Sequence, residues 1–223
     1  MTKKVWAVIA AYNEAGSIGA VLDGLSDAVE AIVVVDDGSA DGTAEMASRH
    51  KAHVLRHLVN LGQGAALQTG IRYALDEGAE VVVTFDADGQ HDPKDIPRLV
   101  AALDGADVAL GSRFLGSTEA MPMTRRLVLR AAVCFTRLTT GLALTDSHNG
   151  LRAFSRGAAA RLRIRQNRMA HASEILEEIA NHKMSYAEVP VCIRYTAYSL
   201  AKGQKLLGSV EILLDLLKGR LFR

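Results

Sequence analysis

Short apolar runs alternate along this chain with segments of helical periodicity, and this alternation restricts the possible folds more than any other feature. The runs at residues 5–11, 31–35 and 81–85 are almost entirely apolar, so they predict strands buried on both faces. Residues 108–110 and, more weakly, 53–57 predict two further strands. Amphipathic segments at 17–25, 43–50, 63–76 and 94–103 predict helices between them. Such alternation favours an α/β fold with a mostly parallel sheet flanked by helices.

The second half of the chain is less regular. Residues 125–140, 170–182 and 206–222 predict helices, and residues 150–154 and 187–195 predict strands. Ser17 and Asp41 stand where helix N-caps would stand. Neither an internal repeat nor a linker interrupts the pattern, so we expect residues 1–223 to form a single domain.

The formal net charge of +1 conceals two halves of opposite sign. Residues 1–112 contain 8 Lys and Arg against 17 Asp and Glu, whereas residues 113–223 contain 18 against 8. An acidic half suits a metal site, and a basic half suits phosphate groups or an anionic membrane surface. The alternative is that the charges are only scattered over solvated faces.

Several classes of protein are disfavoured by what the sequence lacks. A run of 18 uncharged apolar residues is missing, so we expect no transmembrane helix, and residues 5–11 are too short for a signal peptide. Cys134 and Cys192 lack the spacing of a metal or disulfide framework, which fits a cytoplasmic setting. Aromatic residues are not interleaved with basic ones, so we expect no nucleic-acid partner. Without a dinucleotide fingerprint, a nicotinamide-dependent oxidoreductase is disfavoured.

Polar clusters follow four of the predicted strands. They are Tyr12-Asn13-Glu14, Asp36-Asp37-Gly38-Ser39, residues 86–91 and Gly111-Ser112-Arg113. In open α/β sheets, ligands bind beyond the carboxyl ends of the strands. We therefore expect these clusters to meet at one edge of the sheet and to form the functional site together.

Asp86 and Asp88 are the sharpest feature of these clusters. Two carboxylates two residues apart at a strand end can face the same side, where they repel each other unless a cation lies between them. Mg²⁺ or Mn²⁺ prefers such oxygens and keeps substrate phosphates as further ligands, and Gln90 can add a neutral oxygen. The alternative is an acidic turn without a ligand.

Two other segments predict contacts with a nucleotide. Asp36 and Asp37 stand where an acidic residue can accept hydrogen bonds from a ribose or a base, although a turn into the next helix is the alternative. Gly62 and Gln63 open the helix at 63–76, where backbone N–H groups can approach an anion or a base closely. His171, on a later predicted helix, can face the site, but a structural histidine is the preferred interpretation.

Six motifs occur in a fixed order and carry a family resemblance. They are Val-Ile-Ala-Ala-Tyr-Asn-Glu (8–14), Val-Val-Asp-Asp-Gly-Ser (34–39), Asn-Leu-Gly-Gln-Gly (60–64), Phe-Asp-Ala-Asp-Gly-Gln-His-Asp-Pro (85–93), Gly-Ser-Arg-Phe (111–114) and Asp-Ser-His-Asn-Gly-Leu-Arg (146–152). Together they resemble the family 2 glycosyltransferases, and within them the dolichyl- or polyprenyl-phosphate sugar transferases. The resemblance implies a GT-A fold, a nucleotide-sugar donor, a divalent metal (Mg²⁺ or Mn²⁺) and inversion at the anomeric carbon.

The resemblance also assigns roles residue by residue. On the donor side, Tyr12, Asn13 and Glu14 would line the nucleotide pocket, with Asp37 and Asp36 near the base or ribose. Asp88 and Gln90 would hold the metal, and Asp86 the metal or the ribose. Arg113 and Arg152 would face phosphates, and Lys202 matches a late basic loop. Asp146 would be the general base if the acceptor is a hydroxyl group.

We therefore expect a metal-dependent inverting glycosyltransferase on the cytoplasmic face of the membrane. It would move a sugar to a polyprenyl phosphate or lipid-linked glycan in cell-envelope polysaccharide or glycoconjugate synthesis. Residues 1–112 would form the nucleotide-sugar and metal half, and residues 113–223 the acceptor and membrane-facing half. One alternative is a glycosyltransferase with a soluble or polysaccharide hydroxyl acceptor. Another is a non-catalytic nucleotide-sugar-binding subunit of a membrane complex.

Two basic amphipathic segments can replace membrane-spanning helices. In one, Arg125, Arg126 and Arg130 accompany the apolar Leu127, Val128, Leu129 and Val133; the other is residues 206–222. Such helices can lie in the plane of the lipid headgroups. Packing on the core is the alternative for both, and a small membrane-protein partner or a homo-oligomer is a further possibility.

Overall fold

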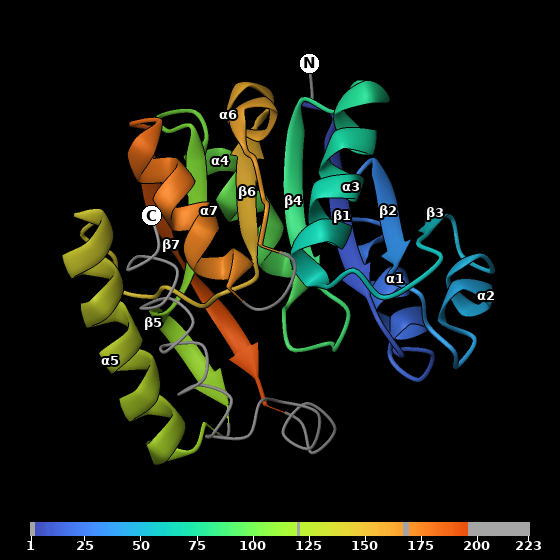
Figure 1. The fold of residues 1–223 in the computed structure, drawn as a ribbon, viewed down its shortest axis with the longest axis horizontal. Coiled ribbons are helices and arrows are strands. Elements are labelled where there is room, and N and C mark those ends of the chain that lie inside the picture. Colours follow the sequence, from blue (N-terminus) through green and yellow to red (C-terminus); the bar gives the residue numbers. More distant parts are fainter. Residues whose placement is uncertain (1–2, 120, 167–169, 196–223) are drawn as a thin grey trace.

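A mixed sheet forms the centre of the protein (Figure 1). The structure is a computed structural model that describes residues 3–119, 121–166 and 170–195. Within these ranges seven strands pair in the order β3-β2-β1-β4-β6-β5-β7. The strands are β1 (Val5–Ala11), β2 (Ala31–Asp36), β3 (His53–Arg56), β4 (Val81–Asp86), β5 (Val108–Glu119), β6 (Arg152–Ser155) and β7 (Tyr186–Arg194).

Helices cover both faces of this sheet, which confirms the predicted α/β fold. They are α1 (Ile18–Leu25), α2 (Thr43–Ala47), α3 (Gln63–Asp76), α4 (Ile96–Ala102), α5 (Met123–Thr140), α6 (Arg156–Arg161) and α7 (His171–Asn181), with a 3-10 turn at Pro93–Asp95. Side chains of α1, α2 and α4 pack in one apolar core, and those of α3, α6 and α7 in the other. Neighbouring residues of β1 alternate between the two cores, as the period of a strand requires.

The direction of β6 brings distant residues together. Strands β1, β2, β3 and β4 pair in parallel with one another, and β5 is parallel to β7, so the sheet is mostly parallel as predicted. Only β6, among the described strands, runs antiparallel to both of its neighbours. Its first residue, Arg152, pairs with Thr84 of β4 and Leu110 of β5. The start of β6 therefore lies at the edge where β4 ends.

Several element boundaries differ from the predictions. Strand β5 continues to Glu119 because a bulge between Ser112 and Ser117 resets its register with β7. This extension is mostly exposed, so the sequence contains no apolar run that would have predicted it. Asp41 does not occupy the N-cap of α2; Gly42 does, and Asp41 Oδ1 accepts a hydrogen bond from the backbone N of Thr43 (3.1 Å). The helix predicted at residues 206–222 lies outside the described residues.

None of the helices in the described ranges has both the length and the apolar character needed to cross a membrane.

Candidate active site

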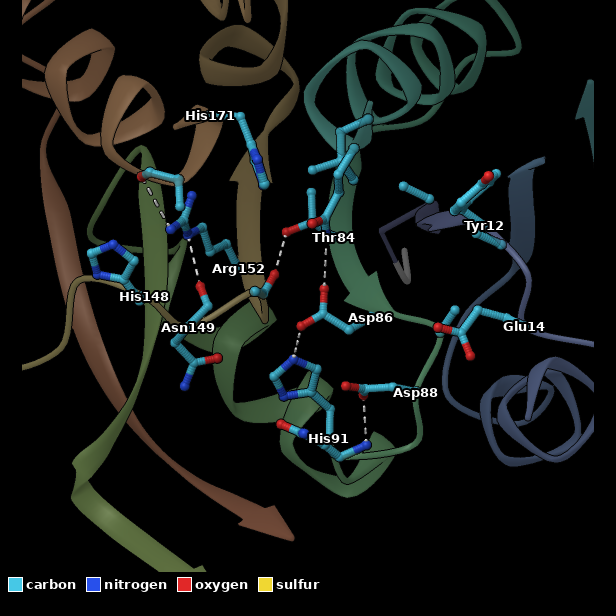
Figure 2. Close-up of a pocket in the computed structure, with 18 of the residues that line it drawn as sticks. Tyr12, Glu14, Thr84, Asp86, Asp88, His91, His148, Asn149, Arg152 and His171 are labelled. Carbon is cyan, nitrogen blue, oxygen red and sulfur yellow. Dashed lines mark hydrogen bonds and ion pairs between the residues drawn. The ribbon is translucent and has the colours of Figure 1, made fainter. Parts of the chain in front are cut away.

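A cleft of about 550 Å³ opens at the carboxyl edge of the sheet. Figure 2 shows side chains converging on it from β4, from the start of β6, from the loops after β1 and β4 and from the loop before β6. Most of the predicted site residues line this cleft: Tyr12, Glu14, Asp37, Gly62, Gln63, Asp86, Asp88, Gln90, Arg113 and Arg152. Asn13, Asp36 and Asp146 do not line it, and Lys202 lies outside the described residues.

Asn13 and Asp36 stabilise the turns behind the cleft. The backbone N of Asn13 donates to Ser39 Oγ (2.9 Å), and Asn13 Oδ1 accepts from the backbone N of Ala40 (3.0 Å). Asp36 is fully buried; its Oδ1 accepts from the backbone N of Ser39 (3.1 Å), and its Oδ2 lies 3.2 Å from Arg56 Nε. These bonds hold the loops after β1 and β2 against each other, so the two side chains support the site from outside it.

Asp37 anchors the loop that begins α3. Its Oδ1 lies 2.7 Å from His57 Nδ1 and accepts from the backbone N of Leu61 (3.0 Å), while its Oδ2 accepts from the backbone N of Gly62 (2.7 Å). Gly62 has a φ of 98°, in the region that favours glycine. The loop therefore presents Gly62 and Gln63 to the cleft in a defined conformation.

Asp86 is held from several sides at the end of β4. His91 Nε2 lies 2.8 Å from its Oδ2, and Gln63 Nε2 donates to its Oδ1 (3.3 Å). Burial alone would raise the pKa of Asp86, but the hydrogen bond with His91 and the electrostatic influence of His91, His171 and Arg152 outweigh it and lower that pKa. Asp86 is therefore a stable carboxylate at neutral pH.

Asp88 is in the opposite electrostatic situation. Burial and the negative charge of Asp86 raise the pKa of Asp88, and Glu14 adds to the effect. Its Oδ1 accepts a hydrogen bond from the backbone N of Gln90 (3.0 Å). Figure 2 shows Asp86, Asp88 and Glu14 on the same part of the cleft. This excess of negative charge would be relieved by a cation.

The acidic pair fits a divalent cation that shares its ligands with a phosphate substrate. Among the described residues no group of three or more His, Cys, Asp or Glu side chains is arranged to hold a metal on its own. A complete protein cage is not required, since Mg²⁺ is usually bound by one or two carboxylates together with substrate phosphates. Asp88, Asp86 and Gln90 supply oxygen atoms of the preferred kind.

Arg113 is tied to the loop that follows α5. Its Nε donates to Asp146 Oδ2 (2.6 Å), its Nη1 to Tyr195 Oη (2.9 Å) and its Nη2 to the backbone O of His148 (2.5 Å). Burial opposes the charge of Arg113, but Asp146 and Tyr195 outweigh this effect and raise its pKa. Arg113 is therefore a permanent cation, and each of its three guanidinium nitrogens donates one hydrogen bond to the protein.

The carboxyl group of Asp146 is completely enclosed by these contacts. Its side chain is 0% exposed, and its Oδ1 accepts from the backbone N of His148 (3.2 Å). A general base must reach the proton that it abstracts. The enclosed position of Asp146 therefore speaks against the predicted role as a base and makes it a partner of Arg113.

Arg152 is buried at the start of β6. Its Nε donates to the backbone O of Asn149 (2.9 Å), and its Nη2 lies 3.4 Å from the backbone O of Ser147 and of Ala172. Burial lowers the pKa of Arg152 to about 10, so the guanidinium stays charged at neutral pH. It places a buried positive charge beside the carboxylate of Asp86.

Sequence reasoning assigned no role in the site to several polar residues that line the cleft, among them His91, Arg125, His148 and Asn149. Three of them lie inside the motifs 85–93 and 146–152, so their membership of these motifs was the signal that could have placed them in the site. His171 was interpreted as a structural histidine, but the structure places it at the start of α7 against the cleft. Its position depends on how α7 packs, which helical periodicity does not specify.

His148 makes the stability of the protein dependent on pH. Burial and the positive charge of Arg152 lower the pKa of His148 to about 4. Because the unfolded chain binds a proton near the ordinary pKa of about 6.5, this histidine stabilises the protein above that pH and loses the contribution as the pH falls toward 4.

We expect this loss to be about 2 kcal/mol in the free energy of unfolding between pH 7 and pH 5. The free energy of unfolding is measured with urea at both pH values for the wild type and for His148→Gln. The contribution of His148 is the difference between the pH dependences of the two proteins. Equal dependences would show that the pKa of His148 is the same in the folded and the unfolded protein.

The fold defines the class of this protein. It matches the crystal structure of glucosyl-3-phosphoglycerate synthase from Mycobacterium tuberculosis with Mn²⁺, UDP and glucosyl-3-phosphoglycerate, with a TM-score of 0.74 and 22% sequence identity, over 97% of this chain and 79% of that chain. The fold is thus that of the GT-A glycosyltransferases. The same enzyme has also been solved with Mg²⁺ and UDP, with a TM-score of 0.75.

Residues 6–163 match the family Glycosyl transferase family 2, and this chain belongs to that family and is a glycosyltransferase. An uncharacterized protein of Methanocaldococcus jannaschii is 38% identical over 98% of this chain and 93% of its own length. UDP-N-acetylglucosamine–dolichyl-phosphate N-acetylglucosaminyltransferase of Methanococcus voltae is 34% identical over 96% of this chain and 95% of its own length. An undecaprenyl-phosphate mannosyltransferase of Micrococcus luteus is 38% identical over 68% of this chain.

Proposed function

We propose that this glycosyltransferase moves a sugar from a nucleoside diphosphate donor to a polyprenyl phosphate, with inversion at the anomeric carbon and with Mg²⁺ or Mn²⁺ as cofactor. One observation carries the proposal: the acidic pair Asp86 and Asp88 shares its cleft with Arg113, Arg125 and Arg152 from the second half of the chain. The acidic pair suits a cation bound to the donor diphosphate, and the arginines suit a second phosphate. The Methanococcus voltae relative, named for a dolichyl-phosphate acceptor, supports this choice.

The donor side of the cleft comes from residues 1–112. Asp88, with Asp86 and Gln90, would hold the cation, which supplies charge stabilisation for the departing diphosphate. Arg152 adds a buried positive charge in the same cleft, where electrostatic stabilisation is stronger than in water. Asp37 holds the backbone of Gly62 in place beside the nucleotide.

The acceptor side comes from residues 113–223. Arg125 lies at the start of α5 with its guanidinium 4.9 Å from the centre of the Tyr195 ring. It lines the cleft, where its guanidinium would meet an anionic acceptor. Lys202, outside the described residues, remains a further candidate.

The transfer needs no general base when the acceptor is a phosphate. An oxygen of the acceptor phosphate forms the new bond to the anomeric carbon while the bond from that carbon to the donor β-phosphate oxygen breaks. The bonding electron pair leaves with the nucleoside diphosphate. Because the acceptor oxygen is already an anion, no proton has to be removed. The enclosed carboxyl of Asp146 is compatible with this chemistry. It disfavours a hydroxyl acceptor, because such an acceptor needs a base that can reach its proton.

Such an acceptor is anchored in lipid, so we place the enzyme at the cytoplasmic face of a membrane, in the synthesis of cell-envelope polysaccharide or glycoconjugates. Association with a small membrane-protein partner and formation of a homo-oligomer stay predictions.

A matched pair of acceptors tests the proposal. The purified protein is incubated with Mn²⁺ and with the sugar nucleotide whose diphosphate raises its thermal stability most in the presence of Mn²⁺. Sugar transfer is then compared between a short polyprenyl phosphate and the corresponding polyprenol. We expect transfer to the phosphate alone. Transfer to the alcohol, or a stability increase with NAD⁺ but with no nucleoside diphosphate, would contradict the proposal.

Asp146→Asn separates a base from a positioning residue. Removing one partner of a buried ion pair costs about 3–5 kcal/mol, so we expect the free energy of unfolding to fall by roughly that amount. The pH profile of kcat/KM should keep its shape, since no proton passes through this carboxyl. Asp104→Asn is the control, because its exposed pair with Lys3 is worth about 1 kcal/mol or less. Loss of the acidic limb of the pH profile in Asp146→Asn would restore the base assignment.

A further inference from the structure

Helix α5 exposes an apolar stripe that faces away from the protein. Of its eighteen residues, only Val133 and Thr136 are buried. At 3.6 residues per turn, the exposed residues Met123, Leu127, Ala131, Cys134 and Leu138 fall on one side of the helix, and we call this set the α5 stripe. Met123, Leu127 and Leu138 are 69%, 65% and 82% exposed. Figure 1 shows α5 at the margin of the molecule, beyond α7.

A row of positive charge accompanies the stripe along the helix. The exposed Arg126, Arg130 and Arg137 lie on the adjoining side of α5, and the helix contains no Asp or Glu. A helix with an apolar face beside Lys or Arg and no opposing charge is typical of helices that lie in the headgroup plane of an anionic bilayer. Charge complementarity therefore favours a lipid surface over an apolar protein groove.

The stripe differs from the apolar face that the sequence predicted. That face included Val133, but the structure turns Val133 into the protein and leaves Leu127 in solvent. The orientation of α5 thus comes from its packing.

The helix that carries the stripe also borders the cleft, through the first turn and on its inward side. Arg125 lies in the first turn of α5 and lines the cleft, and its guanidinium covers the ring of Tyr195. The hydroxyl of Tyr195 in turn accepts the hydrogen bond from Arg113. The N-terminal end of α5 therefore lies at the cleft, while the stripe occupies the opposite side of the same helix.

We propose that the α5 stripe is the membrane-docking surface of this protein, with its apolar residues at the boundary of the acyl chains and Arg126, Arg130 and Arg137 at anionic headgroups. The inference deepens the proposed function, since it rests on an acceptor that is anchored in lipid. It assigns to one helix the task of bringing the cleft to that lipid.

Co-sedimentation of the full chain with vesicles tests the docking surface. Vesicles of phosphatidylcholine with about a third phosphatidylglycerol are compared with pure phosphatidylcholine, and we expect much stronger binding to the former. Leu127→Glu with Leu138→Glu should reduce the partition coefficient about ten-fold or more for each leucine withdrawn from the bilayer. The control is Leu58→Glu, because Leu58 is 100% exposed on the loop before α3 and lies off the stripe.

The arginine row is tested in the same way. Arg126→Gln with Arg130→Gln should reduce binding to anionic vesicles about five-fold for each arginine, because a basic residue near such a surface is worth about 1 kcal/mol. Arg49→Gln with Arg72→Gln removes the same charge from other exposed positions and is the matched control. Equal losses in the two pairs would mean that net charge alone drives binding and would overturn the proposal.

Three other results would overturn it. Vesicle binding by the leucine variant at the wild-type level would show that the stripe does not touch lipid. A fall of several degrees in its Tm would show that the stripe is covered by another part of the chain. A change from dimer to monomer in light scattering would identify a second copy as the occupant.

Activity on a short, water-soluble polyprenyl phosphate separates this proposal from the proposed function. The stripe variants should retain wild-type transfer to that acceptor, because the stripe is not part of the cleft. If the wild type binds vesicles through the stripe but transfers no sugar to any polyprenyl phosphate, the proposed function fails and the docking surface stands.

Discussion

Asp88→Asn is expected to lose sugar transfer by about 100-fold or more while the folded protein becomes no less stable. The loss follows from the proposed role of this carboxylate as a ligand of the cation. The effect on stability follows from its surroundings, since burial and the charge of Asp86 raise the pKa of Asp88. A carboxylate with a raised pKa destabilises the folded state at neutral pH, and the neutral amide removes that destabilisation.

Two measurements check this prediction together. Kinetics give the loss of kcat/KM, and thermal unfolding without metal gives the change in stability. In addition, the stabilisation of the variant by the nucleoside diphosphate that stabilises the wild type should no longer depend on Mn²⁺. Asp27→Asn, at an exposed acidic position outside the cleft, is the control for a change of charge. Wild-type turnover by Asp88→Asn would exclude Asp88 as a metal ligand.

Gly150→Ala is expected to reduce kcat/KM by about 100-fold through the position of Asp86, because displacements of about 1 Å in an active site can cost this much. A Cβ on Gly150 would lie 2.6 Å from Asp86 Oδ1 and 2.7 Å from its Cγ, and closer still to Oδ2. The carboxylate must therefore move from the place where His91 and Gln63 hold it. We expect stability to fall by only about 1–3 kcal/mol, as is typical of overpacking.

The control for this substitution is Gly157→Ala in α6. Apart from its chain neighbours and the backbone of its own helix, no atom lies within 4 Å of a Cβ added there, so the change should stabilise the helix by about 0.5–1 kcal/mol and leave activity unchanged. If Gly150→Ala retains full activity, the cleft tolerates movement of Asp86 and its exact position is unimportant for catalysis.

Local sequence patterns were sufficient to predict most of the elements that frame the cleft. Strand β1 and helix α3 begin and end at the predicted residues, because the period of apolar residues is a local property. The same holds for the polar clusters, since a ligand site at the carboxyl edge follows from a parallel sheet. Asp37, Asp86 and Asp88 were therefore identified from their places after strands.

The features that the sequence did not predict depend on contacts between segments that are distant along the chain. A strand was expected over residues 150–154, but its direction depends on the neighbours β4 and β5, and this direction brings Arg152 beside Asp86. The family resemblance implied Asp146 as the base for a hydroxyl acceptor, whereas Arg113, 33 residues away along the chain, encloses its carboxyl.

Residue type and spacing thus specified the fold class, the site edge and the acidic pair, because each of these depends on a few neighbouring residues. Packing decided the remaining features. It encloses Asp146, places His171 against the cleft and determines which side of α5 is exposed. Burial and charge pairing depend on long-range contacts, and a single sequence does not contain them in local form.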